Sequence, residues 1–175
     1  MKKCILPVLA MLMLCGCSGG NGSVDLSGIR LGMTVSEVRQ ELGIPGSEAL
    51  DPYYPCDELT AGSDNFSGSD IYLYRFTYGD GVHLDTVNVI PAVSGDFAGQ
   101  YDEFVSSVNS LYDLTPEDWE WEGEYRAYAG FGEGDNELQL SLKIYESNGV
   151  QQVFLDIFDL DIRLRSDIPE IPVIP

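Results

Sequence analysis

The sequence contains few cations. Nine lysines and arginines stand against 29 aspartates and glutamates, which gives a formal net charge of -20. Nucleic acid binding needs a basic face for phosphate contacts, so that class of partner is excluded. Direct docking on anionic lipid headgroups is disfavoured for the same reason. The carboxylates indicate a solvated surface, and a cationic partner or loosely held calcium is the alternative interpretation.

The chain also lacks a long apolar run at its start. Ile5–Leu14 follows a cationic beginning and is too short to span a bilayer as a helix. We interpret residues 1–16 as a signal peptide, because the run ends in Leu14-Cys15-Gly16-Cys17, a lipobox of one aliphatic residue, two small residues and a cysteine. The chain is thus predicted to be a bacterial lipoprotein, with lipid on Cys17. The alternative is an ordinary cleaved signal with an incidental cysteine.

Few thiols remain after this processing. Of the 4 cysteines, Cys4 and Cys15 are removed with the signal and Cys17 is lipidated, which leaves Cys56 with a free side chain. No intramolecular disulfide can form, so the hydrophobic core alone must hold the fold. Residues 17–27 are rich in Gly and Ser and are interpreted as a flexible tether. The predicted location is extracytoplasmic, anchored to an inner or outer bacterial membrane.

One local sequence specifies a short helix from start to end. Thr34 is placed as the N-cap, and Glu37 falls three residues later, which makes a capping box. Gly43 can adopt the left-handed conformation that ends a helix, and Pro45 prevents its resumption. The apolar face of this helix consists of Val35, Val38 and Leu42.

A loop, a hairpin and a second helix follow. Residues 46–70 are rich in Pro, Gly, Ser and Asp and are predicted to be a long surface loop. Two strands, 71–78 and 82–90, enclose a Gly-Asp-Gly turn; neither alternates cleanly, so either both faces are partly covered or a bulge intervenes. Residues 98–112 have helical spacing. A single helical turn carrying Trp119 follows Thr115.

The last third of the chain is predicted to be strands. The first is 125–131, and Glu137–Glu146 then alternates strictly, with four aliphatic residues on one face: Leu138, Leu140, Leu142 and Ile144. Asn148-Gly149 is a strong two-residue turn and leads into 150–160, where Val153, Leu155 and Ile157 are expected to face the core. Residues 166–175 are a proline-spaced tail, expected to be extended and unpaired.

These elements predict an α+β fold, with short helices packed on one face of an antiparallel sheet. The order of helix and strands occurs twice. Residues 28–92 and 93–165 are therefore either two tandem helix-plus-sheet units or one domain, 28–165.

The first helix resembles a family signature. Gly32-Met33-Thr34, followed by Val38 and by Leu42-Gly43-Ile44-Pro45, is similar to the Gly-Met-Thr to Leu-Gly-x-Pro helix of SmpA/OmlA (BamE-like) lipoproteins, which also carry a lipobox. The resemblance implies helices on a small antiparallel sheet and a binding role in outer-membrane assembly. Similar units occur in tandem in β-lactamase-inhibitor-like proteins, which bind other proteins. Outside this helix, no residue matches the family.

The sequence offers little for catalysis. It has one histidine, His83, in a predicted strand, and no nucleophile elbow, Walker loop or zinc spacing. Cys56 and His83 could pair as nucleophile and base, and Glu117 with Asp118 could serve glycoside hydrolysis, but such acidic pairs are expected by chance in this composition. Residues 64–70 do not have calcium-loop spacing. We therefore expect no catalytic residue, no metal site and no cofactor.

Aromatic residues are the remaining candidates for binding. They combine an apolar ring with a polar tip, which suits interface anchors and sugar platforms. The candidate binding residues are Tyr53, Tyr54, Tyr72, Tyr74, Trp119 and Trp121. The alternative for each is a place in the core.

The leading hypothesis is a lipid-anchored, non-catalytic binding module of the cell envelope, whose partner is a protein or an envelope polymer. The first alternative is an inhibitor-like protein that blocks an exported enzyme through acidic and aromatic contacts. An envelope hydrolase is the third.

Overall fold

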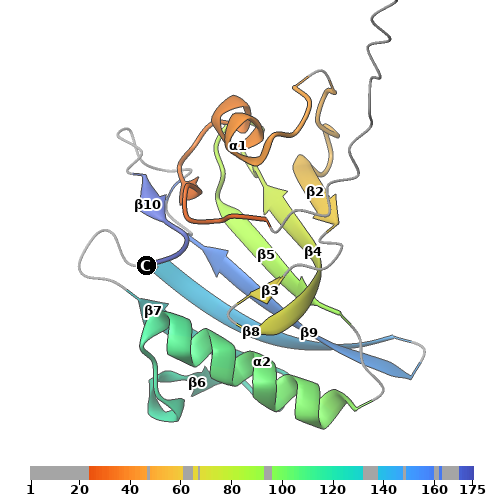
Figure 1. Ribbon diagram of the computed structural model, residues 1–175, viewed down its shortest axis with the longest axis vertical. Coiled ribbons are helices and arrows are strands. Elements are labelled where there is room, and N and C mark those ends of the chain that lie inside the picture. Colours follow the sequence, from red (N-terminus) through yellow and green to blue (C-terminus); the bar gives the residue numbers. More distant parts are fainter. Residues whose placement is uncertain are drawn as a thin grey trace, which may run out of the picture.

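The described residues form two α-helices, a large antiparallel sheet and a small two-stranded sheet. The computed structural model describes residues 24–46, 48–60, 65–66, 68–92, 96–131, 138–147, 149–159, 162 and 170–175. The helices in these ranges are α1 (Val35–Leu42) and α2 (Phe97–Tyr112), with a short 3-10 turn at Pro116–Asp118 (Figure 1). The predicted α+β class is confirmed, although strands predominate. The predicted signal peptide, Cys17 and the tether up to residue 23 lie outside the described residues.

The large sheet is continuous from the first half of the chain to the second. Its strands are β2 (Cys56–Thr60), β3 (Asn65–Phe66), β4 (Ser69–Thr77), β5 (Thr86–Pro91), β6 (Glu120–Trp121), β7 (Arg126–Phe131), β8 (Leu138–Ser147) and β9 (Val150–Phe158). They are ordered β2-β4-β5-β9-β8-β7-β6, and β3 pairs with β4. The last strand of each half, β5 or β9, lies at the centre, where the two pair antiparallel. The strand order of one half therefore mirrors that of the other.

Helix α1 forms as its sequence predicts. The backbone N–H of Thr34 donates to Glu37 Oε2 at 2.7 Å, and the Thr34 side chain accepts from the N–H of Glu37, so the capping box is complete. Gly43 has φ 65° and its N–H donates to carbonyls of the last turn. Val38 is fully buried. This helix packs through a narrow apolar stripe.

The hairpin of β4 and β5 is confirmed, with a bulge between Ile71 and Leu73. Its connection is longer than expected, because β5 begins at Thr86 rather than at residue 82. The preceding segment pairs instead with the start of α1: Gly32 N–H donates to Leu84 O at 2.8 Å, and Val35 N–H donates to Val82 O at 3.0 Å. The connection between β4 and β5 therefore holds α1 against the sheet.

The prediction of a long loop over 46–70 is wrong, because this segment contains β2, β3 and the first residues of β4. Strand β2 is an edge strand, and its sequence, CDELT, has one aliphatic residue, Leu59. It pairs with β4, to which the Glu58–Arg75 ion pair joins it, and the Asp57–Arg39 ion pair joins it to α1. These contacts join residues far apart in sequence, so local patterns do not reveal them.

The second half follows the predicted order. Helix α2 buries Phe104, Val108 and Tyr112. Strands β7, β8 and β9 form near their predicted positions, and Ser147 pairs with Val150, which leaves the two-residue connection expected at Asn148-Gly149. Gly149 has φ 75°, while Asn148 and Glu137 lie outside the described residues.

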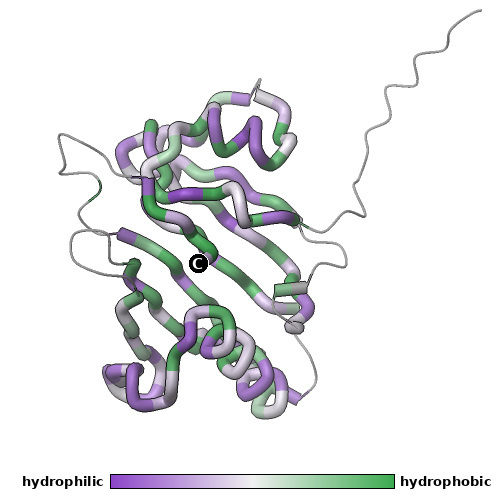
Figure 2. Tube along the Cα trace, turned by 60° about the vertical axis from the view of Figure 1, so that its left-hand side comes forward, coloured by the Kyte–Doolittle hydropathy of each residue, from purple (hydrophilic) through white to green (hydrophobic). Residues whose placement is uncertain are grey.

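Burial on β8 and β9 agrees largely with the predicted alternation. Leu138, Leu140 and Leu142 are buried, as are Val153, Leu155 and Ile157, but Ile144 is only half-buried. Figure 2 shows the change between hydrophobic and hydrophilic residues along the central strands.

The expectation of an unpaired tail is wrong. Strand β10 (Ile171–Pro172) pairs with β1 (Arg30–Leu31), so the two ends of the described domain form a small sheet of their own. Val173 is 0% exposed, and its carbonyl accepts from the Tyr112 hydroxyl at 2.6 Å. The regularly spaced prolines led to the prediction of an unpaired segment, but Ile171 and Val173, which lie between prolines, are buried.

Candidate functional site: the open face of the sheet

The two faces of the sheet differ in chemistry. One carries the buried aliphatic and aromatic residues of the central strands, among them Phe76, Val87 and Ile157. The other, named the open face here, carries a polar rung that crosses the whole sheet. Successive cross-strand pairs give this rung the order Glu120, Tyr128, Ser141, Asp156, Asn88, Arg75 and Glu58. A polar residue on each of these seven strands shows that this face is not a second core.

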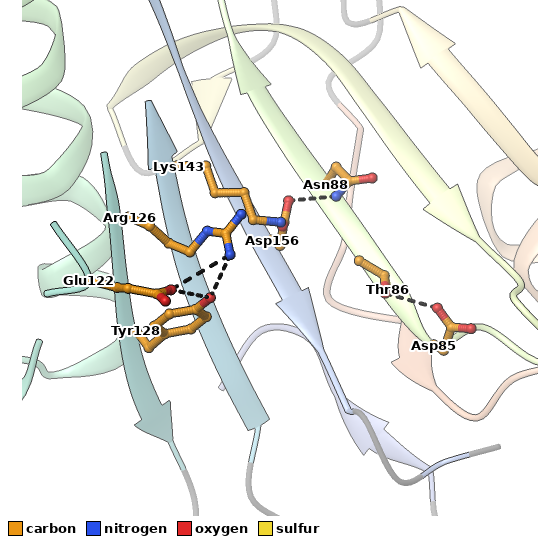
Figure 3. Close-up of polar contacts among 8 residues, drawn as sticks. All are labelled: Asp85, Thr86, Asn88, Glu122, Arg126, Tyr128, Lys143 and Asp156. Carbon is orange, nitrogen blue, oxygen red and sulfur yellow. Dashed lines mark hydrogen bonds and ion pairs between the residues drawn. The ribbon is translucent and has the colours of Figure 1, made fainter. Parts of the chain in front are cut away.

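The centre of the rung is an ordered polar network (Figure 3). Lys143 forms an ion pair with Asp156, and Asn88 Nδ2 donates to the other carboxylate oxygen at 2.7 Å. Asp156 is only 6% exposed, so its charge is stabilised by these two partners rather than by water. Ser141 is fully buried beside it, and its Oγ has no hydrogen-bond partner among the described residues.

A second network lies on β7. The Arg126 Nη1 donates to the Tyr128 hydroxyl at 3.1 Å, and that hydroxyl donates to Glu122 Oε2 at 3.4 Å (Figure 3). The direct distance from Arg126 Nη1 to Glu122 Oε2 is 3.7 Å, a loose ion pair between exposed groups. Arg126 therefore keeps donors directed at solvent.

Next to these networks is a groove of about 530 Å³. Its lining is Glu122, Tyr125, Arg126, Lys143, Ile144, Tyr145 and Phe154. Tyr125 is 56% exposed and Tyr145 57% exposed. The Tyr145 ring stacks on Phe154, with centroids 6.2 Å apart and an interplanar angle of 19°. We name it the Tyr125–Tyr145 groove.

The other end of the open face carries a third cation. Arg75 Nε donates to Glu58 at 2.7 Å, and the guanidinium lies 5.7 Å from the centre of the Tyr54 ring. The described residues include five Lys or Arg: Arg30, Arg39, Arg75, Arg126 and Lys143. The last three of these lie on the open face, so most of the described cations are found there.

A buried polar cluster holds α1 to the edge of the sheet. Arg39 makes bidentate contacts with Asp57, at 2.9 Å from both Nε and Nη2, and donates to Glu48 O at 2.7 Å. The Tyr78 hydroxyl donates to the same carboxylate at 3.0 Å. The hydrogen bond to Asp57 raises the pKa of Arg39, while burial, followed by the Asp57 charge, raises that of Tyr78. Each group is satisfied by the others, which fits a structural role.

A hollow of about 620 Å³ lies between α1 and the residue 81–82 turn. Arg39 is the charged residue of its lining, and it is already paired with Asp57. Thr34, also part of the lining, is engaged in the helix cap. The hollow therefore offers fewer polar groups to a ligand than the open face does.

No contact between Cys56 and His83, the possible nucleophile and base, is found among the described residues. Burial raises the pKa of the Cys56 thiol, with Glu58 the next cause, so the nucleophilic thiolate is disfavoured. His83 Nδ1 lies 2.8 Å from Asp80 Oδ2. Asp118 accepts from the backbone N–H and hydroxyl of Thr115 as a helix cap.

The part of the chain that the structure describes contains neither a cluster of metal ligands nor a membrane-spanning helix. No group of three or more His, Cys, Asp or Glu residues there could hold a metal ion. No helix within the described ranges is long and apolar enough to cross a membrane.

The predicted binding aromatics divide into two groups. Tyr74 and Trp119 are core residues, and the Trp119 indole N–H donates to Asn109 Oδ1 at 2.7 Å. Four are exposed: Tyr53, at 96%, Tyr54, Tyr72 and Trp121. Of these, Tyr54 contacts the open face through Arg75, while Tyr72 lies in the β4 bulge. The structure does not gather the six at one place.

The sequence interpretation missed Tyr125, Arg126, Lys143 and Tyr145, which line the groove together. A signal was present, because Lys143 and Tyr145 occupy the face of the predicted strand 137–146 opposite its leucines. A lysine and a tyrosine on one strand face, in a chain with so few cations, could have marked that face as distinctive.

Comparisons with protein-family models, with curated proteins and with solved structures find no match for this chain.

Proposed function

We propose that this protein is a lipid-anchored, extracytoplasmic binding module of the bacterial envelope, which is not catalytic and holds a protein or envelope polymer with the open face of its sheet. Cys17 provides the anchor to the membrane. The observation that carries the proposal is the polar rung with its flanking aromatics, since one face of the sheet combines exposed tyrosines with three of the five described cations. Tyr and Arg are the residues that most often dominate binding surfaces.

The charge distribution supports the same face. Repulsion between molecules of net charge -20 disfavours self-association. On the open face, by contrast, three cations stand against four carboxylates, which leaves one net negative charge. The carboxylates of the rung and the groove are Glu58, Glu120, Glu122 and Asp156. A partner can therefore approach this face without the full repulsion of the acidic surface.

Site-specific photo-crosslinking in intact cells tests the proposal. A benzophenone amino acid is placed at Glu58 or Tyr145, at opposite ends of the open face, and at Asp102 on the exposed side of α2 as the matched control. The expected result is a defined crosslinked species from both open-face positions and none from Asp102. Crosslinks from Asp102 alone would overturn the assignment of the face, and turnover of an envelope substrate by the pure protein would overturn the non-catalytic role.

The mirrored strand order supports a second candidate. A helix followed by antiparallel strands occurs twice, with β5 and β9 meeting at the centre. We infer two tandem helix-plus-sheet units with both helices on the core face, as in inhibitor-like proteins that bind an exported enzyme. Such a complex would depend on the acidic surface, so raising the salt concentration from 0.05 to about 0.5 M would weaken it strongly. Binding that does not respond to salt would contradict the inhibitor hypothesis.

A further inference from the structure

The Tyr125–Tyr145 groove has the composition of a site for a neutral, polyhydroxylated ligand. Its volume of about 530 Å³ lies within the range of small-molecule sites, roughly 300–1,000 Å³. Its lining combines the apolar rings of Tyr145 and Phe154 with the polar groups of Glu122, Arg126 and Lys143. A ligand that matches it must present apolar faces and hydrogen-bonding edges within a few ångströms of each other.

Charge restricts the ligand further. Arg126 and Lys143 contribute two positive charges, while Glu122 and Asp156, the ion-pair partner of Lys143, contribute two negative ones. The cations of the groove are therefore locally compensated, and neither an anion nor a cation is attracted by a net charge. A neutral ligand with many hydroxyl groups suits the groove better than an ion does. Each hydroxyl can both donate and accept a hydrogen bond, and the groove offers donors as well as an acceptor.

The groove is also organised before any ligand binds. The Tyr145 ring is stacked against Phe154 on the neighbouring strand, and this contact restricts the plane of the exposed ring. Arg126, Tyr128 and Glu122 hold one another by hydrogen bonds, and Lys143 is fixed by Asp156. Side chains held in this way lose little conformational freedom on binding.

From these observations we propose that the Tyr125–Tyr145 groove binds a neutral glycan strand of the cell envelope. The apolar face of a pyranose ring would stack on Tyr145, and its hydroxyls would exchange hydrogen bonds with Arg126, Glu122 and Lys143. This inference rests on the proposed function, because the extracytoplasmic location places the domain beside envelope glycans. It names the class of ligand that the same open face would bind.

Isothermal titration of the full-length protein with chitotetraose, in a detergent without a sugar headgroup, tests the inference, and cellotetraose serves as the analogue without acetamido groups. The expected result is saturable binding of at least one of these two glycans, with an affinity that changes less than about twofold between 0.05 and 0.5 M salt. Tyr145→Ala should weaken this binding about tenfold through loss of stacking, whereas Tyr145→Phe should retain it.

A matched control keeps the test specific. Val150→Ala lies on the same hairpin, is exposed, and is outside the groove, so it should leave the affinity unchanged. If neither tetrasaccharide binds, or if Tyr145→Ala binds as well as the unmodified protein, the glycan inference is wrong. A protein crosslinked from both open-face positions would in that case leave the proposed function standing, while absence of any open-face crosslink would refute the proposed function itself.

Discussion

The C-terminal strand is expected to be a main source of stability, and Val173→Ala tests this. The side chain of Val173 is fully buried in the core between the ends of the domain. Its truncation removes two buried carbons at about 0.8 kcal/mol each and leaves a cavity, so the free energy of unfolding should fall by about 2–3 kcal/mol. Urea unfolding of the full-length chain, followed by tryptophan fluorescence, measures this change.

Two further variants serve as comparisons for Val173→Ala. Tyr112→Phe removes the hydroxyl that donates to Val173 O at 2.6 Å and should cost about 1 kcal/mol. Glu170→Ala changes an exposed residue just before β10 and should cost less than about 0.5 kcal/mol. If Val173→Ala were no more destabilising than Glu170→Ala, the tail would not be part of the core.

Three other predictions concern charge and ionisation. Arg39→Ala should lower the free energy of unfolding by about 3–5 kcal/mol, because it leaves the carboxylate of Asp57 buried without its partner; Arg75→Ala, at an exposed pair, should cost less than about 1 kcal/mol, and equal losses would contradict the argument. Cys56 should react with a disulfide reagent more slowly than free cysteine at pH 8, and faster as the pH rises, because burial raises its pKa; a rate equal to that of free cysteine would refute this. Burial also raises the pKa of Tyr78 and Tyr112 in the folded protein. Tyrosine in the unfolded chain ionises near pH 10, so the free energy of unfolding should be unaffected below about pH 10 and should fall above it. The urea midpoint at pH 9, 10 and 11 measures this decline, and Tyr112→Phe should make it smaller.

Sequence patterns correctly predicted the elements that depend on contacts between residues close together in the chain. The capping box of α1, its Gly43 terminus and the β8–β9 hairpin all form within a few residues of chain. Strand β8 was recognisable because one of its faces is aliphatic and the other polar. Each of these features follows from neighbours in sequence, which is the information that a pattern contains.

The missed elements depend on distant partners. Strand β2 has a polar sequence and is stabilised by β4, Arg39 and Arg75, and β10 is stabilised by β1 and Tyr112. The candidate site was missed for the same reason, since its polar rung arises from the register of seven strands. Tyr74 and Trp119 were considered for binding because ring chemistry alone does not distinguish a core position from a surface one.

The pairing of β1 with β10 also determines where force acts on the molecule. Strand β1 follows closely after the predicted anchor, so tension from the membrane would enter the domain at a strand held by the opposite end of the chain. A load applied through the lipid would be resisted by backbone hydrogen bonds of this small sheet before it reaches the open face. A reporter fused after Pro175 would follow β10 closely and would therefore begin near β1, the strand that comes first after the predicted tether.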